Sequence, residues 1–116
     1  MKKNSFYVTT PIYYVTAKPH LGSLYATLLA DVVARWNKMG GSDVFFLTGT
    51  DEHGQKIAQA AEQAKKDPKD FVDSFIPDYK HAWQMYDIKY DKFIRTTASY
   101  HIKGAQELIS LLKDRG

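Results

Sequence analysis

The stretch PHLGSLYATLLADVVARWNKMGGSDVFFLTGT, residues 19–50, decides the fold. Its first part carries apolar residues at alternating steps of three and one, the spacing of an amphipathic helix with one broad apolar face. These residues are Leu21, Leu24, Tyr25, Leu28, Leu29, Val32, Val33 and Trp36. Pro19 suits the first turn of such a helix, and the Gly40–Gly41 pair suits its end. We expect the apolar face to pack against a core.

Apolar segments on both sides of this helix predict two strands. Residues 5–10 are rich in aromatic and β-branched residues, and we expect Pro11 to end this strand, with a brief resumption over residues 12–15 left open. Residues 43–48 contain the uninterrupted apolar run VFFL, which is typical of a strand buried on both faces of a parallel sheet. Strand, helix and strand together predict a βαβ unit and an α/β fold.

Helices are predicted for most of the remaining chain. The patterns place one helix over residues 54–66 and another from Asp67 onward, which we expect to break near Phe75–Ile76 because of the proline that follows. Residues 91–97 are expected to be extended or loop, and residues 99–113 to form a last helix. Five of its apolar side chains are expected to face inward: Ile102, Ala105, Leu108, Ile109 and Leu112.

The length of the chain limits how the predicted strands and helices can form a complete domain. The 116 residues, 44% hydrophobic and 25% charged, suffice for one domain at most. A sheet of two parallel strands would leave both of its edges open. We therefore expect either the N-terminal half of a larger α/β domain or a chain that completes its sheet with another molecule.

Composition excludes several classes of protein. The sequence has no apolar run near the roughly 18 residues that a membrane span needs, so an integral membrane protein is not expected. The absence of cysteine removes disulfides, thiolate nucleophiles and cysteine-bound zinc, and favours the cytoplasm. Residues 1–50 carry five Lys or Arg and two Asp, an excess that suits an anionic ligand but is too small to establish nucleic-acid binding.

The start of the long helix is a candidate anion site. Free backbone N–H groups and the positive end of the helix dipole meet there. His20 would add a side-chain donor, Gly22 would let a flat ligand approach the backbone, and Ser23 would add a hydroxyl. Taken alone, the segment is more typical of an ordinary helix start.

A second candidate is LTGTDEHG, residues 47–54, at the carboxyl end of the second strand, where open parallel sheets bind their ligands. Two glycines bracket Asp51, Glu52 and His53. Helix capping by Asp51, with Glu52 complementing the helix dipole, explains the pattern equally well. Successive residues point in different directions, so no metal site is predicted. Tyr13 and Tyr14, in the loop before the long helix, could form walls of an apolar pocket.

These segments resemble the methionyl-tRNA synthetases. The resemblance lies in TTPIYY at residues 9–14, PHLG at 19–22 and LTGTDEHGQKI at 47–57, with YDKFIRTT at 90–97 and His101 further on. It runs through essentially the whole chain. It implies the N-terminal half of a Rossmann-type nucleotide-binding domain, with residues 1–116 forming an incomplete catalytic portion that lacks an anticodon-binding domain.

The resemblance also implies roles for single residues. His20, Gly22 and Ser23 would bind ATP, with His20 and Ser23 acting in catalysis and Gly22 lying under the adenine. The methionine site would be formed by Pro11, Ile12, Tyr14 and Asp51, and Asp51 would hold the substrate ammonium. His53 would have a supporting role. The family motif ends in a second histidine where this chain has Ser23, so a phosphate contact is expected to be weakened or moved.

The activity that this resemblance implies is that of a methionine–tRNA ligase. Such an enzyme would activate L-methionine with ATP, accompanied by Mg²⁺, and transfer it to tRNA(Met), while the zinc status of the parent enzyme stays open. The chain is expected to be a fragment, inactive without the remainder of the synthetase. Another class I nucleotidyl-transfer enzyme, or a non-catalytic RNA-binding or dimerising remnant, is the alternative.

Overall fold

The computed structural model describes residues 4–116, and in this part of the chain three parallel strands form one sheet. The strands are β1 (Ser5–Tyr14), β2 (Asp43–Asp51) and β3 (Lys92–Arg95), in the order β1-β2-β3. Helix α1 (Leu21–Met39) connects β1 to β2, which pair in parallel. The predicted βαβ unit is therefore confirmed.

Strand β1 is longer than the sequence indicated. We expected Pro11 to end it, but the strand continues to Tyr14, and its register to β2 shifts between Thr9 and Ile12. Proline lacks the N–H that a regular ladder needs, and an irregularity is one of the few places where a strand accommodates it. Pro11 therefore interrupts the pairing without ending the strand.

The sheet has a third strand beyond the two that the sequence predicted, because β3 forms in the segment that we expected to be extended or loop. Asp91 aligns this short strand with β2: its N–H donates to the Phe46 carbonyl at 2.8 Å, and its carboxylate accepts from the Phe46 N–H at 2.7 Å. Gly49 permits the close pairing, since a Cβ there would lie 2.0 Å from the Ile94 carbonyl oxygen. A strand of four residues leaves little periodic signal in a sequence.

Helix α1 begins and ends close to the predicted residues, but of its predicted apolar face only Leu24 and Leu28 pack partly against the core. His20 is its N-cap, so Pro19 lies before the first turn rather than in it, and Gly41 takes the left-handed conformation after its end (φ +86°). The predicted apolar face is largely exposed, with Leu21 80% and Trp36 74% exposed. The residues that the helix buries are mostly small or polar: Ser23, Thr27, Ala30, Asp31 and Ala34. Small side chains let the helix lie close to the sheet, which spacing alone does not reveal.

Three further helices come after β2: α2 (Gln55–Gln63), α3 (Pro68–Asp73) and α4 (Ile76–Met85). The break predicted near Phe75–Ile76 is confirmed, since α3 ends and α4 begins on either side of Ser74–Phe75. The Asp67 carboxylate caps α3 by accepting from the Lys69 N–H at 2.8 Å. Ile57 and Ala61 of α2 are buried.

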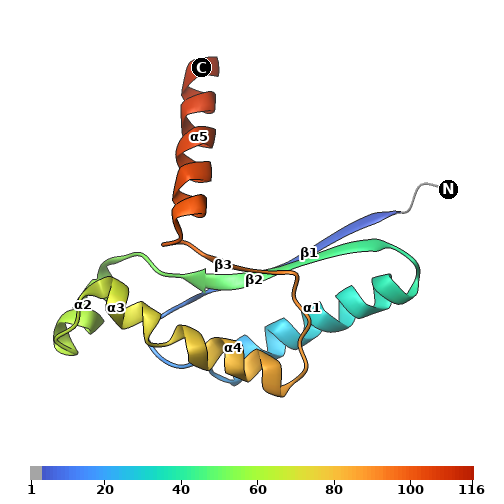
Figure 1. The fold of residues 1–116 in the computed structure, drawn as a ribbon, viewed down its shortest axis with the longest axis horizontal. Helices are drawn as coiled ribbons and strands as arrows, with labels where there is room; N and C mark the ends of the chain where they lie inside the picture. Colours follow the sequence, from blue (N-terminus) through green and yellow to red (C-terminus); the bar gives the residue numbers. More distant parts are fainter. Residues whose placement is uncertain (1–3) are drawn as a thin grey trace.

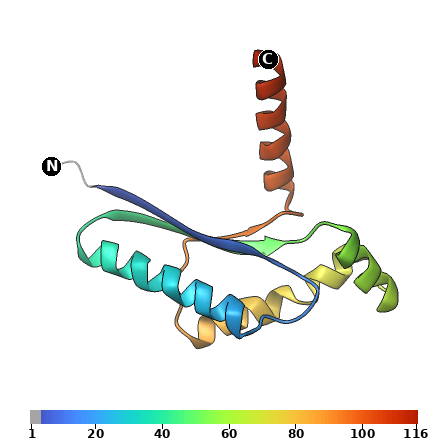
Figure 2. The ribbon, with the colours of Figure 1, turned by 180° about the vertical axis from the view of Figure 1, so that it is seen from behind.

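Helices cover only one face of the sheet. Figures 1 and 2 show α1 and α4 on the same side, while α5 (Ser99–Arg115) rises from the other side. Strand β2 was expected to be buried on both faces, but Val44 and Phe46 are buried whereas Phe45 is 48% exposed. The inward face predicted for α5 is also wrong, because none of residues 99–115 is buried. In residues 4–116 the core lies between the sheet and the α1–α4 layer.

The centre of this core lies beneath the end of β1. Trp83 of α4 is fully buried, and its ring packs against Tyr13 of β1 and Tyr79 of α4. The Tyr13 hydroxyl pairs with Thr27 Oγ1 at 2.8 Å. The chain just beyond Tyr13 is therefore anchored to both α1 and α4, and this is where the candidate residues lie.

Candidate functional site

The first candidate residue, His20, caps helix α1. Its Nδ1 accepts a hydrogen bond from the Gly22 N–H at 3.0 Å. An accepting nitrogen carries no proton, so the neutral ring bears its hydrogen on Nε2, and that N–H remains available to an acceptor. The imidazole lies close to Gly22, where a Cβ would be 2.9 Å from His20 Cε1. The helix start thus holds an exposed ring donor beside open backbone.

A hollow of about 260 Å³ lies at this helix start. Its wall brings together His20 and Ser23 from α1, Tyr14 from β1 and Tyr79 from α4, with Tyr13, Thr16, Ala17 and Lys18 completing it. Burial raises the pKa of the Tyr79 phenol. Ser23 lines the hollow but is only 4% exposed, and its carbonyl accepts from Thr27 Oγ1 at 2.8 Å. Of the two predicted catalytic residues, His20 is therefore the exposed one.

Tyr14 connects this hollow to the end of β2. In the sheet it lies opposite Asp51, and the next N–H, of Val15, donates to the Asp51 carbonyl at 3.2 Å. The Tyr14 hydroxyl reaches Gly54, where a Cβ would lie only 2.4 Å from it. Gly54 also has φ +124°, which side-chain-bearing residues rarely adopt. The position of the Tyr14 phenol therefore requires that residue 54 has no side chain.

Three of the four residues predicted for methionine binding lie on one side of the sheet. Ile12 is opposite Gly49 and Tyr14 is opposite Asp51, and residues two apart in a strand, like directly opposed residues, share a face. Ile12 and Tyr14 are exposed, and Asp51 is half-buried. The fourth, Pro11, is exposed at the register shift. None of the ion pairs in residues 4–116 includes Asp51, so its carboxylate is open to a cationic ligand.

Glu52 has a different role from the one that the sequence suggested. Its side chain is 0% exposed, and it accepts two hydrogen bonds from Arg95, from Nε at 2.7 Å and from the terminal nitrogen at 2.9 Å. The hydroxyls of Thr50 and Thr97 also donate to it. Burial raises the pKa of the Glu52 carboxyl, but the bonds from Arg95, Thr50 and Thr97 outweigh burial and hold the pKa below its ordinary value.

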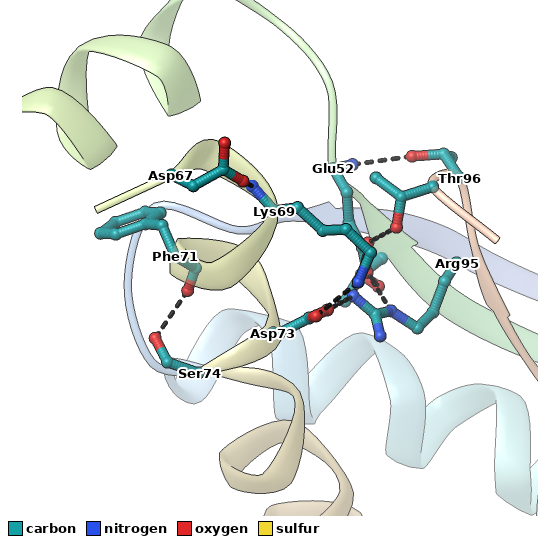
Figure 3. A network of polar contacts seen from close by, with 10 residues as sticks. Glu52, Asp67, Lys69, Phe71, Asp73, Ser74, Arg95 and Thr96 are labelled. Carbon is teal, nitrogen blue, oxygen red and sulfur yellow. Dashed lines mark hydrogen bonds and ion pairs between the residues drawn. The ribbon is translucent and has the colours of Figure 1, made fainter.

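The ion pair continues outward to helix α3. Figure 3 shows Arg95 between Glu52 and Asp73, with Lys69 beyond. Hydrogen bonding to Glu52, and then to Asp73, raises the pKa of Arg95, while bonds from Lys69 and Arg95 lower the pKa of Asp73. From the sequence, Arg95 was expected to match a family pattern or to anchor a loop, but no partner could be assigned to it. The sequence gives one weak signal for this network, which is an acidic residue close after the apolar run VFFL of a predicted buried strand.

The neighbouring His53 is exposed, and its Nε2 lies 3.2 Å from the Thr96 carbonyl oxygen. Residues 4–116 contain no group of three or more His, Cys, Asp or Glu that could hold a metal ion. The helices in this range also include none long and apolar enough to cross a membrane.

Comparison with known proteins places this arrangement in a family. The family model described as tRNA synthetases class I (M) matches residues 6–116. The chain belongs to this family. Similar curated proteins are the methionine–tRNA ligases of Thermotoga maritima, 53% identical over 111 residues, and of Clostridium tetani, 49% identical over 116 residues. The chain is covered to 96% and 100% respectively, but spans only 18% of the length of each relative.

Solved structures confirm the α/β fold of this class I synthetase segment. Mycobacterium tuberculosis methionyl-tRNA synthetase in complex with methionyl-adenylate matches with a TM-score of 0.87 and 39% identity, covering 90% of this chain and 21% of that one. The Agrobacterium radiobacter LeuRS in a ternary complex with tRNA and LeuAMS has a TM-score of 0.88 at 22% identity, covering 100% and 15%. The second likeness concerns the fold alone.

Proposed function

We propose that this chain supplies the methionine- and ATP-binding part of a methionine–tRNA ligase. The observation that carries the proposal is the placement of Tyr14, which lines the hollow at His20 and lies opposite Asp51 in the sheet. One small molecule with an anionic and a cationic end could therefore reach both the helix start and the carboxylate. The curated relatives are named methionine–tRNA ligase, and a similar structure holds methionyl-adenylate, which supports the same substrates.

The open side of the sheet suits methionine. An ionised Asp51 would accept a charge-assisted hydrogen bond from the substrate ammonium, which is stronger than a bond between neutral groups. The exposed side chains of Ile12 and Tyr14, with Pro11 beside them, would border the thioether. Contact between sulfur and an aromatic ring favours this arrangement modestly.

The start of α1 suits the phosphates of ATP. The positive end of the helix and the His20 Nε2–H would stabilise the negative charge that develops when a methionine carboxylate oxygen attacks the α-phosphorus and pyrophosphate leaves. Gly22 would leave room for the adenine, and the buried Ser23 would contribute little beyond the wall of the hollow. Mg²⁺ would arrive with the ATP phosphates. This chemistry needs positioning more than covalent participation by the protein.

The later steps of the proposed reaction need the rest of a ligase. Methionyl-adenylate would pass its methionyl group to tRNA(Met) in the cytoplasm, where proteins are made. Residues 1–116 correspond to less than a fifth of the curated relatives, so we expect the segment alone to be inactive in aminoacylation.

Methionine-dependent exchange of pyrophosphate into ATP tests the proposal, measured on the full chain as the genome encodes it. We expect exchange with methionine and none with leucine. Asp51→Asn should raise the KM for methionine about 10-fold or more, the worth of a hydrogen bond to a charged group, and leave the KM for ATP within about twofold. Exchange that depends on another amino acid, or an unchanged methionine KM in the variant, would refute the assignment.

A further inference from the structure

We propose that Glu52, held by Arg95, is a positioning residue that fixes the direction of Asp51. The inference rests on the proposed function, because it concerns how the ammonium contact is kept in place. It starts from the location of Glu52 between two candidate site residues, Asp51 and His53, although its own side chain is fully buried on the other side.

Three consecutive residues at and just after the end of β3 form hydrogen bonds with the residue that follows β2. Arg95 and Thr97 donate to the Glu52 carboxylate, and between them Thr96 Oγ1 accepts from the Glu52 N–H at 2.8 Å. The Thr96 N–H also donates to the Thr50 carbonyl at 3.3 Å. Both the backbone and the side chain at position 52 are thus fixed by residues more than forty positions later.

These contacts of Glu52 constrain the direction of the neighbouring Asp51 side chain. Successive side chains of a strand point to opposite faces, so a Glu52 held inside the network forces Asp51 to the open side that it shares with Tyr14. The Val15 N–H holds the Asp51 carbonyl on the β1 side, and the contacts of Glu52 hold the chain on the β3 side. If Glu52 were released, the turn after β2 could rotate, and no ion pair in residues 4–116 restrains the Asp51 carboxylate itself. Orientation of a carboxylate within a fraction of an ångström matters for binding a cation.

The charged and polar partners of Glu52 favour one fixed position of its buried carboxylate. A buried carboxylate loses its hydration and is stable only when paired and fully hydrogen-bonded. Glu52 is satisfied by a two-point contact with Arg95, which constrains the plane of the carboxylate as well as its distance. Asp73 and Lys69 complete an alternating sequence of charges out to the surface (Figure 3).

The decisive experiment compares two ligands on the full chain. Methionine binding is measured beside inhibition of exchange by 4-(methylsulfanyl)butanoate, which is methionine without its amino group. In Glu52→Gln we expect the KM for methionine to rise about 10-fold, because a misdirected Asp51 loses its bond to the ammonium. The inhibition constant of the analogue should change less than about twofold, since the analogue never makes that bond.

Two further variants keep the test decisive. Glu107→Gln removes the same carboxylate from an exposed ion pair with Lys103 and should leave both constants unchanged. Thr97→Val keeps the shape of its side chain and removes one donor to Glu52, so it should show the methionine-specific effect on a smaller scale. If Glu52→Gln does not fold, the Thr97→Val variant still tests the inference.

An equal loss for methionine and its analogue would overturn the inference, because it would show a merely structural role for Glu52. An unchanged methionine KM in both Glu52→Gln and Thr97→Val would overturn it as well. Failure of the proposed function is a separate result: the unmodified chain would then show no exchange that depends on methionine.

Discussion

The contact between Tyr14 and Gly54 yields a prediction for a single methyl group. In Gly54→Ala the added Cβ would meet the Tyr14 hydroxyl at 2.4 Å, at a position with φ +124°. We expect the variant to lose about 1–3 kcal/mol of unfolding free energy, typical of a strained backbone position. The displaced phenol should also raise the KM for methionine. Urea unfolding and pyrophosphate exchange measure the two effects.

Gly104→Ala is the matched control, because a Cβ there meets nothing within 4 Å in the middle of α5. It should be neutral or stabilise the chain by up to about 1 kcal/mol, the helix preference of alanine over glycine. Equal unfolding free energies for Gly54→Ala and the unmodified chain would show that the Tyr14 contact is not rigid.

Gly22→Ala separates stability from binding. The new Cβ would lie 2.9 Å from His20 Cε1, so the imidazole must move and its hydrogen bond to the Gly22 N–H must weaken. Loss of the cap, about 1 kcal/mol, is offset by the better helix propensity of alanine. We expect a melting temperature within a few degrees of the unmodified chain and a KM for ATP raised several-fold. A normal ATP KM would mean that neither His20 nor Gly22 lies near the nucleotide.

For single residues, the sequence indicated which positions could belong to a site better than it indicated which side chains contact each other. Short-range patterns were enough to select the helix start at His20 and the turn at Asp51. They could not show that Glu52 faces inward, because its partner Arg95 lies 43 residues away. Likewise the exposure of Ser23 depends on how closely α1 approaches the sheet, which no local pattern fixes.

The pairing of β2 with β3 depends on one missing side chain. A Cβ at Gly49 would lie 2.0 Å from the Ile94 carbonyl oxygen, which is backbone and cannot move aside alone. Gly49→Ala should therefore separate the strands and disrupt the nearby bonds between Arg95 and Glu52. We expect a loss of about 2 kcal/mol or more of unfolding free energy, with early hydrogen exchange at residues 92–95. Protection of these amides equal to that of the unmodified chain would contradict the prediction.

Elements were predicted well where the signal is local. The limits of α1, the break before α4 and the cap at Asp67 follow from periodicity, proline and capping chemistry. The orientation of α1 and α5 was wrong because hydrophobic spacing identifies an apolar face without saying what covers it. In α1 the small and polar face is the buried one, while of the predicted apolar face Leu24 and Leu28 pack partly against the core.

Over residues 4–116, helices cover one face of the sheet, while α5 projects from the other side and the stacked pair Tyr7 and Phe45 lies on the uncovered face. Three of the four candidate methionine residues lie on the uncovered face, while the network that we infer to direct Asp51 lies on the covered side. Binding residues and their supports are therefore separated by the thickness of the sheet. Charged side chains on the covered side, such as Glu52 and Asp73, should then influence the stability of the fold without contacting a ligand themselves.

Acid unfolding tests that separation. Glu52 and Asp73 both have pKa values below their ordinary range, so their contribution to stability is fully present above the unfolded-state values of about 4 and is lost as pH falls through the lower folded-state values. Glu52→Gln should cost about 3 kcal/mol of unfolding free energy at pH 7, because a buried charge pair loses one partner. The difference from the unmodified chain should shrink as pH falls below about 4 and through the lower folded-state pKa of Glu52, below which the protonated side chain resembles glutamine. Urea unfolding across pH 3–7 measures it, with Glu107→Gln expected to stay within about 0.5 kcal/mol of the unmodified chain throughout. A Glu52→Gln difference that is constant with pH would mean that folding does not lower the pKa of Glu52, and the contacts with Arg95, Thr50 and Thr97 could not then hold its carboxylate as we infer.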